Sequence, residues 1–407
     1  MKERLAAKER KERKKVNSGM HRRKFLRYGA HTALSLSFIS LGGCAHRDPK
    51  RVEGKAAVAW NALVAELEAQ VPRLMVEDKV PGVSIAVVHD AQVVWRRGFG
   101  LADVTTKVPV DNDTVFEAAS MSKPVFAYVA LKLCEKGVIG LDTPLTKYAP
   151  ESFLTGDPRL ELITPRHILS HSSGLQNWRS QEKPLKIHFA PGSQYMYSGE
   201  GYYYLQSVIT HLKGRVNRND CAQFEAGFEV CATDIDEFMT RSVLSPFEMR
   251  SSGYSMNQVI ERHRATGHDS EGNPFPKRKP TGPGLARYAA VGALQTTPAD
   301  YAKFLIEVLN PKGPDDFRLK KDTVSEMLRP HVKVVNGPHT SSWGLGWQIQ
   351  DKGLINHGGD NKGFHCHAIA SPKTKSGFVV MTNGDGGPKL IQQVFELPAL
   401  DALWSVG

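Results

Sequence analysis

The sequence carries little net charge once its first residues are set aside. The 407 residues have a formal charge of +11, from 53 Lys and Arg against 42 Asp and Glu. Residues 1–27 hold 12 of the basic and 3 of the acidic residues, and residues 28–43 hold neither, so 41 basic and 39 acidic residues remain. A body with a net charge of only +2 lacks the basic surface that nucleic-acid-binding proteins need, and we expect no nucleic-acid partner.

The chain also lacks an apolar run long enough to cross a bilayer as an ordinary helix. The uncharged stretch at residues 28–41 falls short of the roughly 20 residues required. It follows the arginine pair Arg22-Arg23 and ends in Leu41-Gly42-Gly43-Cys44. These parts, in this order, resemble a bacterial twin-arginine lipoprotein signal whose cysteine is lipidated. Residues 20–44 are therefore expected to direct export to the bacterial cell envelope, with Cys44 as a periplasm-facing lipid anchor.

The alternative for residues 28–41 is a short helix on the membrane surface, followed by a cysteine without a role. Met20 stands just before the signal, so residues 1–19 are either a basic N-terminal extension or a mis-assigned start. Residues 45–55 are polar and predict a tether. The rest shows no internal repeat and no second domain, which predicts one domain over residues 56–407.

Only four cysteines remain beyond the predicted signal. We expect no cofactor. Cys221 and Cys231 bracket a nine-residue stretch in an apparent insertion, where an oxidising compartment favours a disulfide. Cys134 and Cys366 are expected to be small buried side chains. His365 and His367 share one face of a predicted strand, but no Asp, Glu or Cys on that face completes a metal site, so we expect no metal.

Hydrophobic periodicity predicts strands near both ends of the chain and helices between them. Apolar spacing predicts helices at residues 56–77, 124–136, 297–309 and 389–404, and strands at 83–88, 93–100, 346–350, 363–370 and 376–382. Pro72 is expected to kink or break the first helix. The arrangement predicts an α+β fold: an antiparallel sheet built from both chain ends and flanked by helices, with an inserted, mainly helical lobe at about residues 143–290.

Ser120-Met121-Ser122-Lys123 is the main candidate for catalytic residues. Serine and lysine three positions apart lie on one face of a helix, where the lysine can help to make the serine a nucleophile. The segment leads into an apolar helical pattern with Pro124 in its first turn. The other Ser-x-x-Lys match, Ser180 to Lys183, lies in a polar stretch ending at Pro184 and has no apolar face to bury.

Motifs along most of the chain resemble the serine β-lactamase and penicillin-recognising family, in particular its class C β-lactamase, esterase and D-aminopeptidase branch. The similar segments are Pro81–Val88, Ser120–Lys123, Lys136–Leu145, Ile168–Leu175, Ala190–Gly192 leading into Tyr197-Ser198-Gly199, and His357-Gly358-Gly359. Their order and spacing make chance agreement very rare. The resemblance implies a serine hydrolase with the β-lactamase/transpeptidase-like fold, acting through an acyl-enzyme.

The resemblance also assigns roles to individual residues. Ser120 matches the acylated serine, Lys123 the lysine of the proton network, and Tyr197 the tyrosine that moves protons between nucleophile, leaving group and water. A phenol needs a neighbouring positive charge to act as a base at neutral pH, and Lys123 would supply it. The backbone N–H groups of Ser120 and Asp360 match the oxyanion donors. His171 is expected to be a hydrogen-bonded loop residue rather than a base.

The residues expected to bind substrate are Gly199, His357, Gly358 and Gly359. Two of these positions, 199 and 357, depart from the family pattern. Many relatives have an asparagine at position 199, whose amide binds an acylamino group of the substrate. Classical β-lactamases have lysine at position 357, and a neutral imidazole anchors a carboxylate less well. We therefore expect a small-molecule or peptide substrate (an ester, amide or D-amino-acid peptide). The alternatives are a β-lactamase or D,D-peptidase, and an acylated sensor or binding lipoprotein without turnover.

Overall fold

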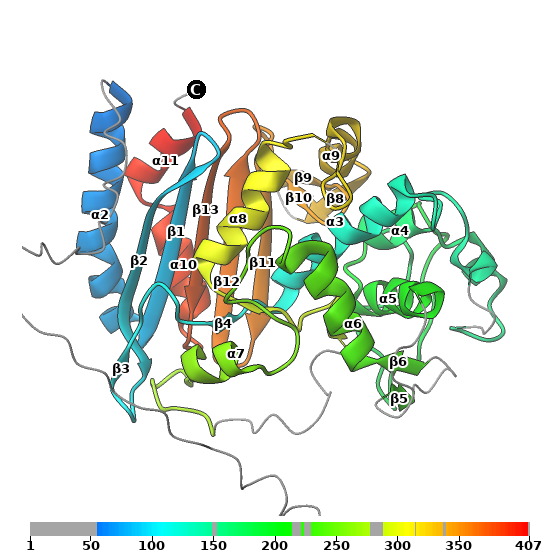
Figure 1. Ribbon diagram of the computed structural model, residues 1–407, viewed down its shortest axis with the longest axis horizontal. Helices are drawn as coiled ribbons and strands as arrows, with labels where there is room; N and C mark the ends of the chain where they lie inside the picture. Colours follow the sequence, from blue (N-terminus) through cyan, green and yellow to red (C-terminus); the bar gives the residue numbers. More distant parts are fainter. Residues whose placement is uncertain are drawn as a thin grey trace, which may run out of the picture. The chain divides into compact units, whose positions relative to one another are not determined.

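The strands near both chain ends build one nine-stranded antiparallel sheet (Figure 1). The computed structural model describes residues 55–148, 153–213, 221–223, 229–276, 288–313, 315–336 and 339–405, so the predicted signal and Cys44 lie outside the described residues. In sheet order the strands are β3 (Val108–Pro109), β2 (Gln92–Asp103), β1 (Gly82–His89), β13 (Ser376–Thr382), β12 (Phe364–Ser371), β11 (Ile355–Asn361), β10 (Gln348–Ile349), β9 (His339–Trp343) and β8 (Val332–Asn336).

The two ends of the chain meet in the middle of this sheet. β1 pairs with β13 in a register that sets Val83 opposite Thr382 and Ile85 opposite Val380. Every residue of β13 is buried, because helices cover both faces of the sheet at this point. The predicted α+β class and the construction of the sheet from both ends are confirmed.

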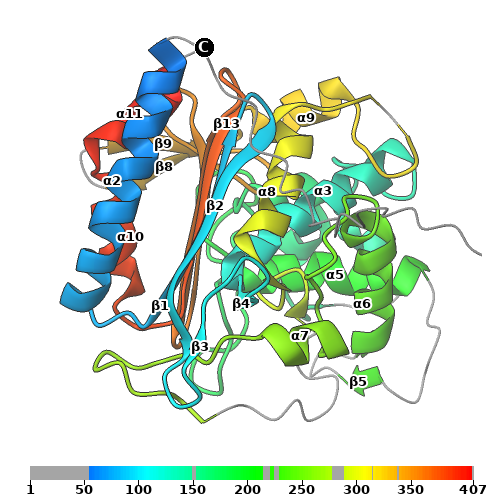
Figure 2. The same ribbon diagram turned by 60° about the vertical axis from the view of Figure 1, so that its left-hand side comes forward.

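Three helices cover one face of the sheet: α2 (Lys55–Glu77), α10 (Gly387–Phe395) and α11 (Pro398–Ser405) (Figure 2). Leu67 and Val71 of α2 are fully buried against it, and each such side chain contributes about 1.5–3 kcal/mol by leaving water. Pro72 does not break α2, which continues to its predicted end at Glu77. The single helix expected at residues 389–404 is two helices, because Pro398 lacks the N–H that would continue α10 and instead begins α11.

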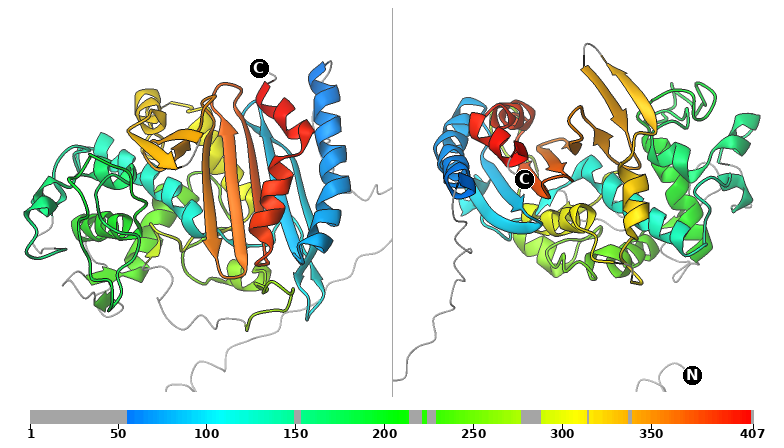
Figure 3. Two further views of the ribbon diagram at one scale, coloured as in Figure 1. Left: turned by 180° about the vertical axis from the view of Figure 1, so that it is seen from behind. Right: turned by 90° about the horizontal axis from the view of Figure 1, so that it is seen from above.

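The helical lobe and α8 (Pro298–Leu309) lie on the opposite face (Figure 3). The remaining helices are α3 (Ser122–Glu135), α4 (Pro165–Leu169), α5 (Gly199–Lys213), α6 (Ala232–Met239), α7 (Gln258–His263) and α9 (Lys321–Leu328), with short 3-10 turns η1 (Ala119–Met121), η2 (Leu145–Lys147) and η3 (Pro158–Leu162), and one π-helical turn, η5 (Thr240–Leu244). Within the described ranges, none of the helices combines the length and the apolar character needed to cross a membrane.

Two small strand pairs complete the fold. β4 (Phe116–Glu117) pairs with β7 (Gln295–Thr296), and β5 (Cys221–Gln223) pairs with β6 (Glu229–Cys231) in the predicted insertion. The second register sets Cys221 opposite Cys231. Antiparallel partners have Cα atoms about 4.5–5.5 Å apart, within the range that disulfides span, so this backbone suits the predicted disulfide, which stays a prediction.

Candidate active site

Ser120 lies in the tight turn η1, immediately before α3. The α-helix itself begins at Ser122, two residues before the predicted start at residue 124. The Ser122 hydroxyl holds the turn by donating to the Ala119 carbonyl (2.7 Å) and accepting from the Leu294 N–H (3.0 Å). Ala119 has a φ of +44°, a strained value for a residue with a side chain, and such strain is typical of functional sites.

Lys123 is buried beside this serine. Its Nζ donates to Ser120 Oγ (3.1 Å) and to the Val291 carbonyl (2.8 Å), and the residue is 1% exposed. In the described part of the chain no carboxylate forms an ion pair with Lys123. Burial therefore lowers the pKa of Lys123 to about 7, which leaves a large neutral fraction at neutral pH. A neutral amine within hydrogen-bonding distance of a serine hydroxyl can act as its base.

Tyr197 also contacts the nucleophile. Burial raises the pKa of the Tyr197 phenol, and its hydrogen bond with Ser120 offsets only part of that rise. Nζ of Lys123 lies 4.8 Å from the centre of the tyrosine ring. The raised pKa leaves the Tyr197 phenol protonated at neutral pH, and in that form it can donate a proton. The expectation that Lys123 makes Tyr197 a base stays a prediction.

The lowered pKa of Lys123 predicts the pH dependence of turnover. Because the neutral amine is the reactive form, kcat/KM should rise as pH increases through about 7 and fall about tenfold per unit below it. The measurement is kcat/KM for an uncharged ester between pH 5 and 9. In Lys123→Ala, the residual kcat/KM should not show this rise near pH 7. A kcat/KM that falls as pH rises through 7 in the unmodified protein would assign the base to another group.

His171 packs against the ring of Tyr197. Its ring lies 4.2 Å from the Tyr197 ring, centre to centre, and its Nδ1 accepts the Ser198 N–H at 3.0 Å. The residue is fully buried, which holds the pKa of His171 well below its ordinary value and keeps the imidazole neutral. These contacts match the hydrogen-bonded loop role expected for it and make His171 a positioning residue.

The third motif lies on β11, whose edge faces Ser120. β10 pairs with β11 only at Ile355 and Asn356, and no other described strand pairs with that edge from His357 onward. A Cβ atom on Gly359 would lie 3.1 Å from the Ser120 nitrogen and 2.3 Å from the Ala118 carbonyl oxygen, so only glycine fits there. This close approach brings the backbone of η1 against β11, as the predicted pairing of Ser120 and Asp360 as oxyanion donors requires.

His357 is a buried, neutral side chain of the cavity wall. Burial first, and then the nearby Lys123 charge, lower the pKa of His357 to about 3. Its Nδ1–H donates to the Gly358 carbonyl at 2.6 Å, so Nε2 carries the lone pair. A neutral acceptor cannot form an ion pair with a carboxylate, which agrees with the weaker anchoring expected from the sequence.

His365 and His367 share one face of β12, as strand alternation predicts. His365 Nδ1 lies 2.7 Å from Asp360 Oδ1, whereas His367 packs against Phe395, with ring centres 5.0 Å apart. Among the described residues, no group of three or more His, Cys, Asp or Glu side chains is arranged to hold a metal ion.

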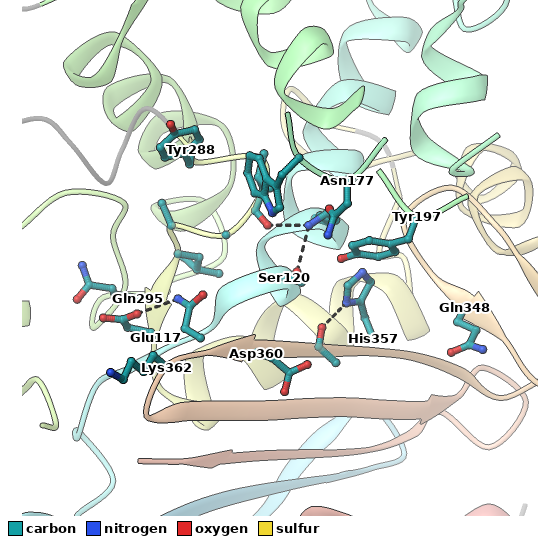
Figure 4. Close-up of a pocket in the computed structure, with 18 of the residues that line it drawn as sticks. Glu117, Ser120, Asn177, Tyr197, Tyr288, Gln295, Gln348, His357, Asp360 and Lys362 are labelled. Atoms are coloured by element: carbon teal, nitrogen blue, oxygen red, sulfur yellow. Dashed lines mark hydrogen bonds between the residues drawn. The ribbon is translucent and has the colours of Figure 1, made fainter. Parts of the chain in front are cut away.

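These groups open into a cavity of about 740 Å³ (Figure 4). Tyr197, His357 and Gln348 lie on one side of Ser120, and Glu117, Gln295 and Lys362 on the other. The walls of the cavity are formed by Glu117, Ser120, Lys123, Asn177, Trp178, Tyr195, Tyr197, Tyr288, Val291, Gly292, Ala293, Leu294, Gln295, Trp343, Gln348, His357, Gly358, Asp360, Asn361 and Lys362. Gly199 and Gly359, both expected to bind substrate, are not among these lining residues.

Asn177 covers Gly199 and was missed by the sequence analysis. Asn177 Oδ1 accepts the Gly199 N–H (2.9 Å), and its carbonyl accepts the Glu200 N–H (3.0 Å), so it satisfies two free donors at the start of α5. A Cβ on Gly199 would lie 2.7 Å from the Asn177 carbonyl oxygen and 2.9 Å from Oδ1. The space that a side chain at position 199 would enter is thus filled by the backbone and side-chain oxygens of Asn177.

The substitution Gly199→Asn is therefore expected to destabilise this wall rather than restore an amide-binding residue. An asparagine at 199 collides with the Asn177 backbone, and relieving such a clash typically costs about 1–3 kcal/mol. We expect a lower melting temperature and no gain in nitrocefin turnover, measured beside Ser180→Ala as a control. A stable Gly199→Asn variant that hydrolyses nitrocefin faster would show that the segment at 177 moves aside.

Comparisons with known proteins agree with the fold. The model of the beta-lactamase family matches residues 61–400. Protein flp of Staphylococcus aureus (strain MRSA252) is 24% identical over 336 residues, which are 77% of this chain and 62% of flp, so the chain spans less than two thirds of that relative. Esterase EstB of Burkholderia gladioli is 35% identical over 122 residues, 29% of this chain and 30% of the esterase.

A solved structure is similar over most of the chain. The octameric penicillin-binding protein homologue from Pyrococcus abyssi superposes with a TM-score of 0.64 and 25% sequence identity, covering 79% of this chain and 74% of that one. The family match extends over most of the described sheet and the helical lobe, including Ser120, Lys123 and Tyr197. The chain belongs to the beta-lactamase family.

Proposed function

We propose that the protein is an exported serine hydrolase that cleaves carboxylic esters, and with lower efficiency amides or D-amino-acid peptides, through an acyl-enzyme on Ser120. The observation that carries this proposal is Lys123, buried with a pKa of about 7 and 3.1 Å from Ser120 Oγ. Burying a lysine without a carboxylate partner costs stability, so a purely structural role does not explain it. A base for Ser120 needs the lowered pKa that this burial produces.

In the proposed reaction, Lys123 takes the proton of Ser120 as Oγ attacks the carbonyl carbon. The N–H groups of Ser120 and Asp360 stabilise the oxyanion, and Tyr197 donates a proton to the leaving oxygen. Water then attacks the acyl-enzyme, with its proton taken up by the same network, and Ser120 is released. Each step needs only groups that lie at the cavity wall.

Two features favour esters over β-lactams. His357 is neutral, so it supplies no cation for the carboxylate that β-lactams carry. The partial similarity to an esterase supports the same substrate class. A β-lactamase or D,D-peptidase activity is the alternative, and an acylated sensor is the alternative from another class.

Substrate profiling tests the proposal. The full chain is assayed with p-nitrophenyl esters of increasing acyl length, nitrocefin and D-Ala-D-Ala peptides. Steady turnover of a short ester with kcat/KM above that for nitrocefin supports an esterase, and the reverse order supports a β-lactamase. A burst of one product per protein without further turnover identifies a sensor.

The same proposal includes export and anchoring through Cys44. Arg22-Arg23 and Leu41-Gly42-Gly43-Cys44 are the features behind it. In a bacterial host, the protein should fractionate with membranes, and Cys44→Ser should remove the lipid and release the protein from them. A conservative Cys134→Ser variant, changed outside the signal, is the control. Soluble cytoplasmic protein that retains residues 1–43 contradicts this part.

A further inference from the structure

The two expected oxyanion donors belong to different segments of the chain. Ser120 lies in η1, whereas Asp360 lies on β11, next to the last residue of that strand. Among the residues that the structure describes, no backbone hydrogen bond joins η1 to β11. Two N–H groups stabilise one oxyanion only if both lie about 2.7–3.1 Å from it. Packing and side-chain contacts are therefore left to set the spacing of the donors.

One such contact lies at the start of the turn. Cys366 on β12, opposite Gly359 in the register of β11 and β12, donates its thiol hydrogen to the Ala118 carbonyl at 3.1 Å. The turn is thereby held against Gly359, where a side chain would not fit. This contact fixes β11 before Asp360 and leaves the end of the strand, beyond Asp360, to be held by another group.

A second contact holds the strand beyond Asp360. Asn361 Nδ2 donates to Glu117 Oε2 at 2.8 Å, and Glu117 Oε1 accepts from Arg264 Nη2. Glu117 is 7% exposed and lines the cavity (Figure 4), as Asn361 does. Because the arginine occupies one carboxylate oxygen, only the other oxygen is left for Asn361, which fixes the direction of this bond. We call the hydrogen bond between Glu117 and Asn361 the bridge.

The bridge lies close to both donors along the chain. Glu117 precedes Ser120 by three residues, and Asn361 directly follows Asp360. Glu117 is itself held in place, because it lies on β4, which pairs with β7. The bridge therefore connects the segment that carries one oxyanion donor to the segment that carries the other.

We propose that Glu117 and Asn361 are positioning residues, which hold the N–H of Asp360 at the distance from Ser120 that the oxyanion requires. Without the bridge, the end of β11 is free to move away from η1, because no other described strand pairs with this edge of β11. The loss should then appear in the transition state, in which the carbonyl oxygen becomes negatively charged, and not in substrate binding. This inference rests on the proposed function.

Two substrates that differ in one atom test the bridge. p-Nitrophenyl acetate and its thionoester, which has sulfur in place of the carbonyl oxygen, release the same p-nitrophenolate, and its absorbance gives kcat/KM for the full chain. Sulfur is a weak acceptor, so we expect the ratio of the two kcat/KM values to exceed the ratio for hydroxide by at least about 100-fold. This excess is the oxygen preference. Asn361→Leu should lower it by about tenfold or more.

The double variant Glu117→Leu/Arg264→Met breaks the bridge from its other end without leaving a buried charge unpaired. It should lower the oxygen preference as much as Asn361→Leu does. A fall in Asn361→Leu alone would mean that Asn361 binds the substrate directly, and would overturn the positioning role. Asn273→Leu is the matched control, because Asn273 Nδ2 also donates to a carboxylate, that of Asp269 (3.3 Å), but does not line the cavity. It should keep the preference of the unmodified protein.

Melting curves measure how much of each variant is folded, and Asn361→Ala replaces Asn361→Leu if the latter does not fold. Partial unfolding lowers both kcat/KM values by the same factor, so a loss of stability alone leaves the oxygen preference unchanged. An unchanged preference in the folded variants, or an unmodified protein that hydrolyses the ester without any oxygen preference, overturns the bridge alone. Absence of turnover for every ester, or turnover that survives Ser120→Ala, overturns the proposed function instead.

Discussion

Ser120→Ala should abolish ester hydrolysis, with a loss of about 10⁴-fold or more in kcat, the scale seen when a covalent nucleophile is removed. The reason is geometric. Ser120 Oγ accepts a hydrogen bond from Lys123 Nζ at 3.1 Å. The turn that carries Ser120 is held by hydrogen bonds from the hydroxyls of Ser122 and Tyr301. A fluorophosphonate should add its mass to the peptide that contains Ser120, as measured by mass spectrometry after digestion.

The second Ser-x-x-Lys segment supplies the control for this experiment. Ser180 Oγ donates to Glu182 Oε2 and accepts from the Lys183 N–H in an exposed loop, without a buried amine nearby. Ser180→Ala should therefore retain full labelling and turnover. Labelling that persists in Ser120→Ala, or that maps to Ser180, would refute the assignment of the nucleophile.

Lys123→Ala and Tyr197→Phe should each lower kcat by about 10² to 10⁴-fold, the range for general acid–base groups. Lys123 supplies the neutral amine, and Tyr197 the phenolic proton for the leaving oxygen. Because both groups contact the same hydroxyl, the loss in the double variant should be smaller than the product of the single losses.

The measurement is kcat for one ester in the four proteins of this cycle, with Lys132→Ala as the control. Lys132 is buried on the same helix, but its Nζ binds Glu135 and the Arg318 carbonyl, so any loss there reports on stability alone. Single losses that multiply fully in the double variant would show that Lys123 and Tyr197 act in separate steps.

Much of the sheet could be predicted because its strands are buried. Val83 to Val88 is apolar except for Ser84 and lies between turn residues, and residues 378–381 form a second apolar run; such segments fit the middle of a covered sheet. The hairpin of β8 and β9 was missed, since His339–Trp343 is mostly polar. In the sequence, the dipeptide Asn336-Gly337 is a turn signal that would have indicated the end of a strand here.

The reactive groups could be predicted more readily than the walls around them. Ser120 and Lys123 are neighbours on one turn, so local spacing is enough to bring them together. Asn177 and Gln295 reach the cavity only through long-range contacts, to the start of α5 in one case and to β4 in the other. Sequence periodicity carries no information about such contacts, and neither residue belongs to a motif.

The pairing of β1 with β13 has a consequence for the order of folding. Val83 meets Thr382 only after almost the whole chain has left the ribosome, so the apolar strand Gly82–His89 waits through most of synthesis without its central neighbour. Contacts between residues so distant along the chain form slowly, and an unpaired apolar strand is prone to associate with other chains. β2 follows β1 directly along the chain and pairs with one edge of β1. The other edge of β1 stays open until β13 has been made.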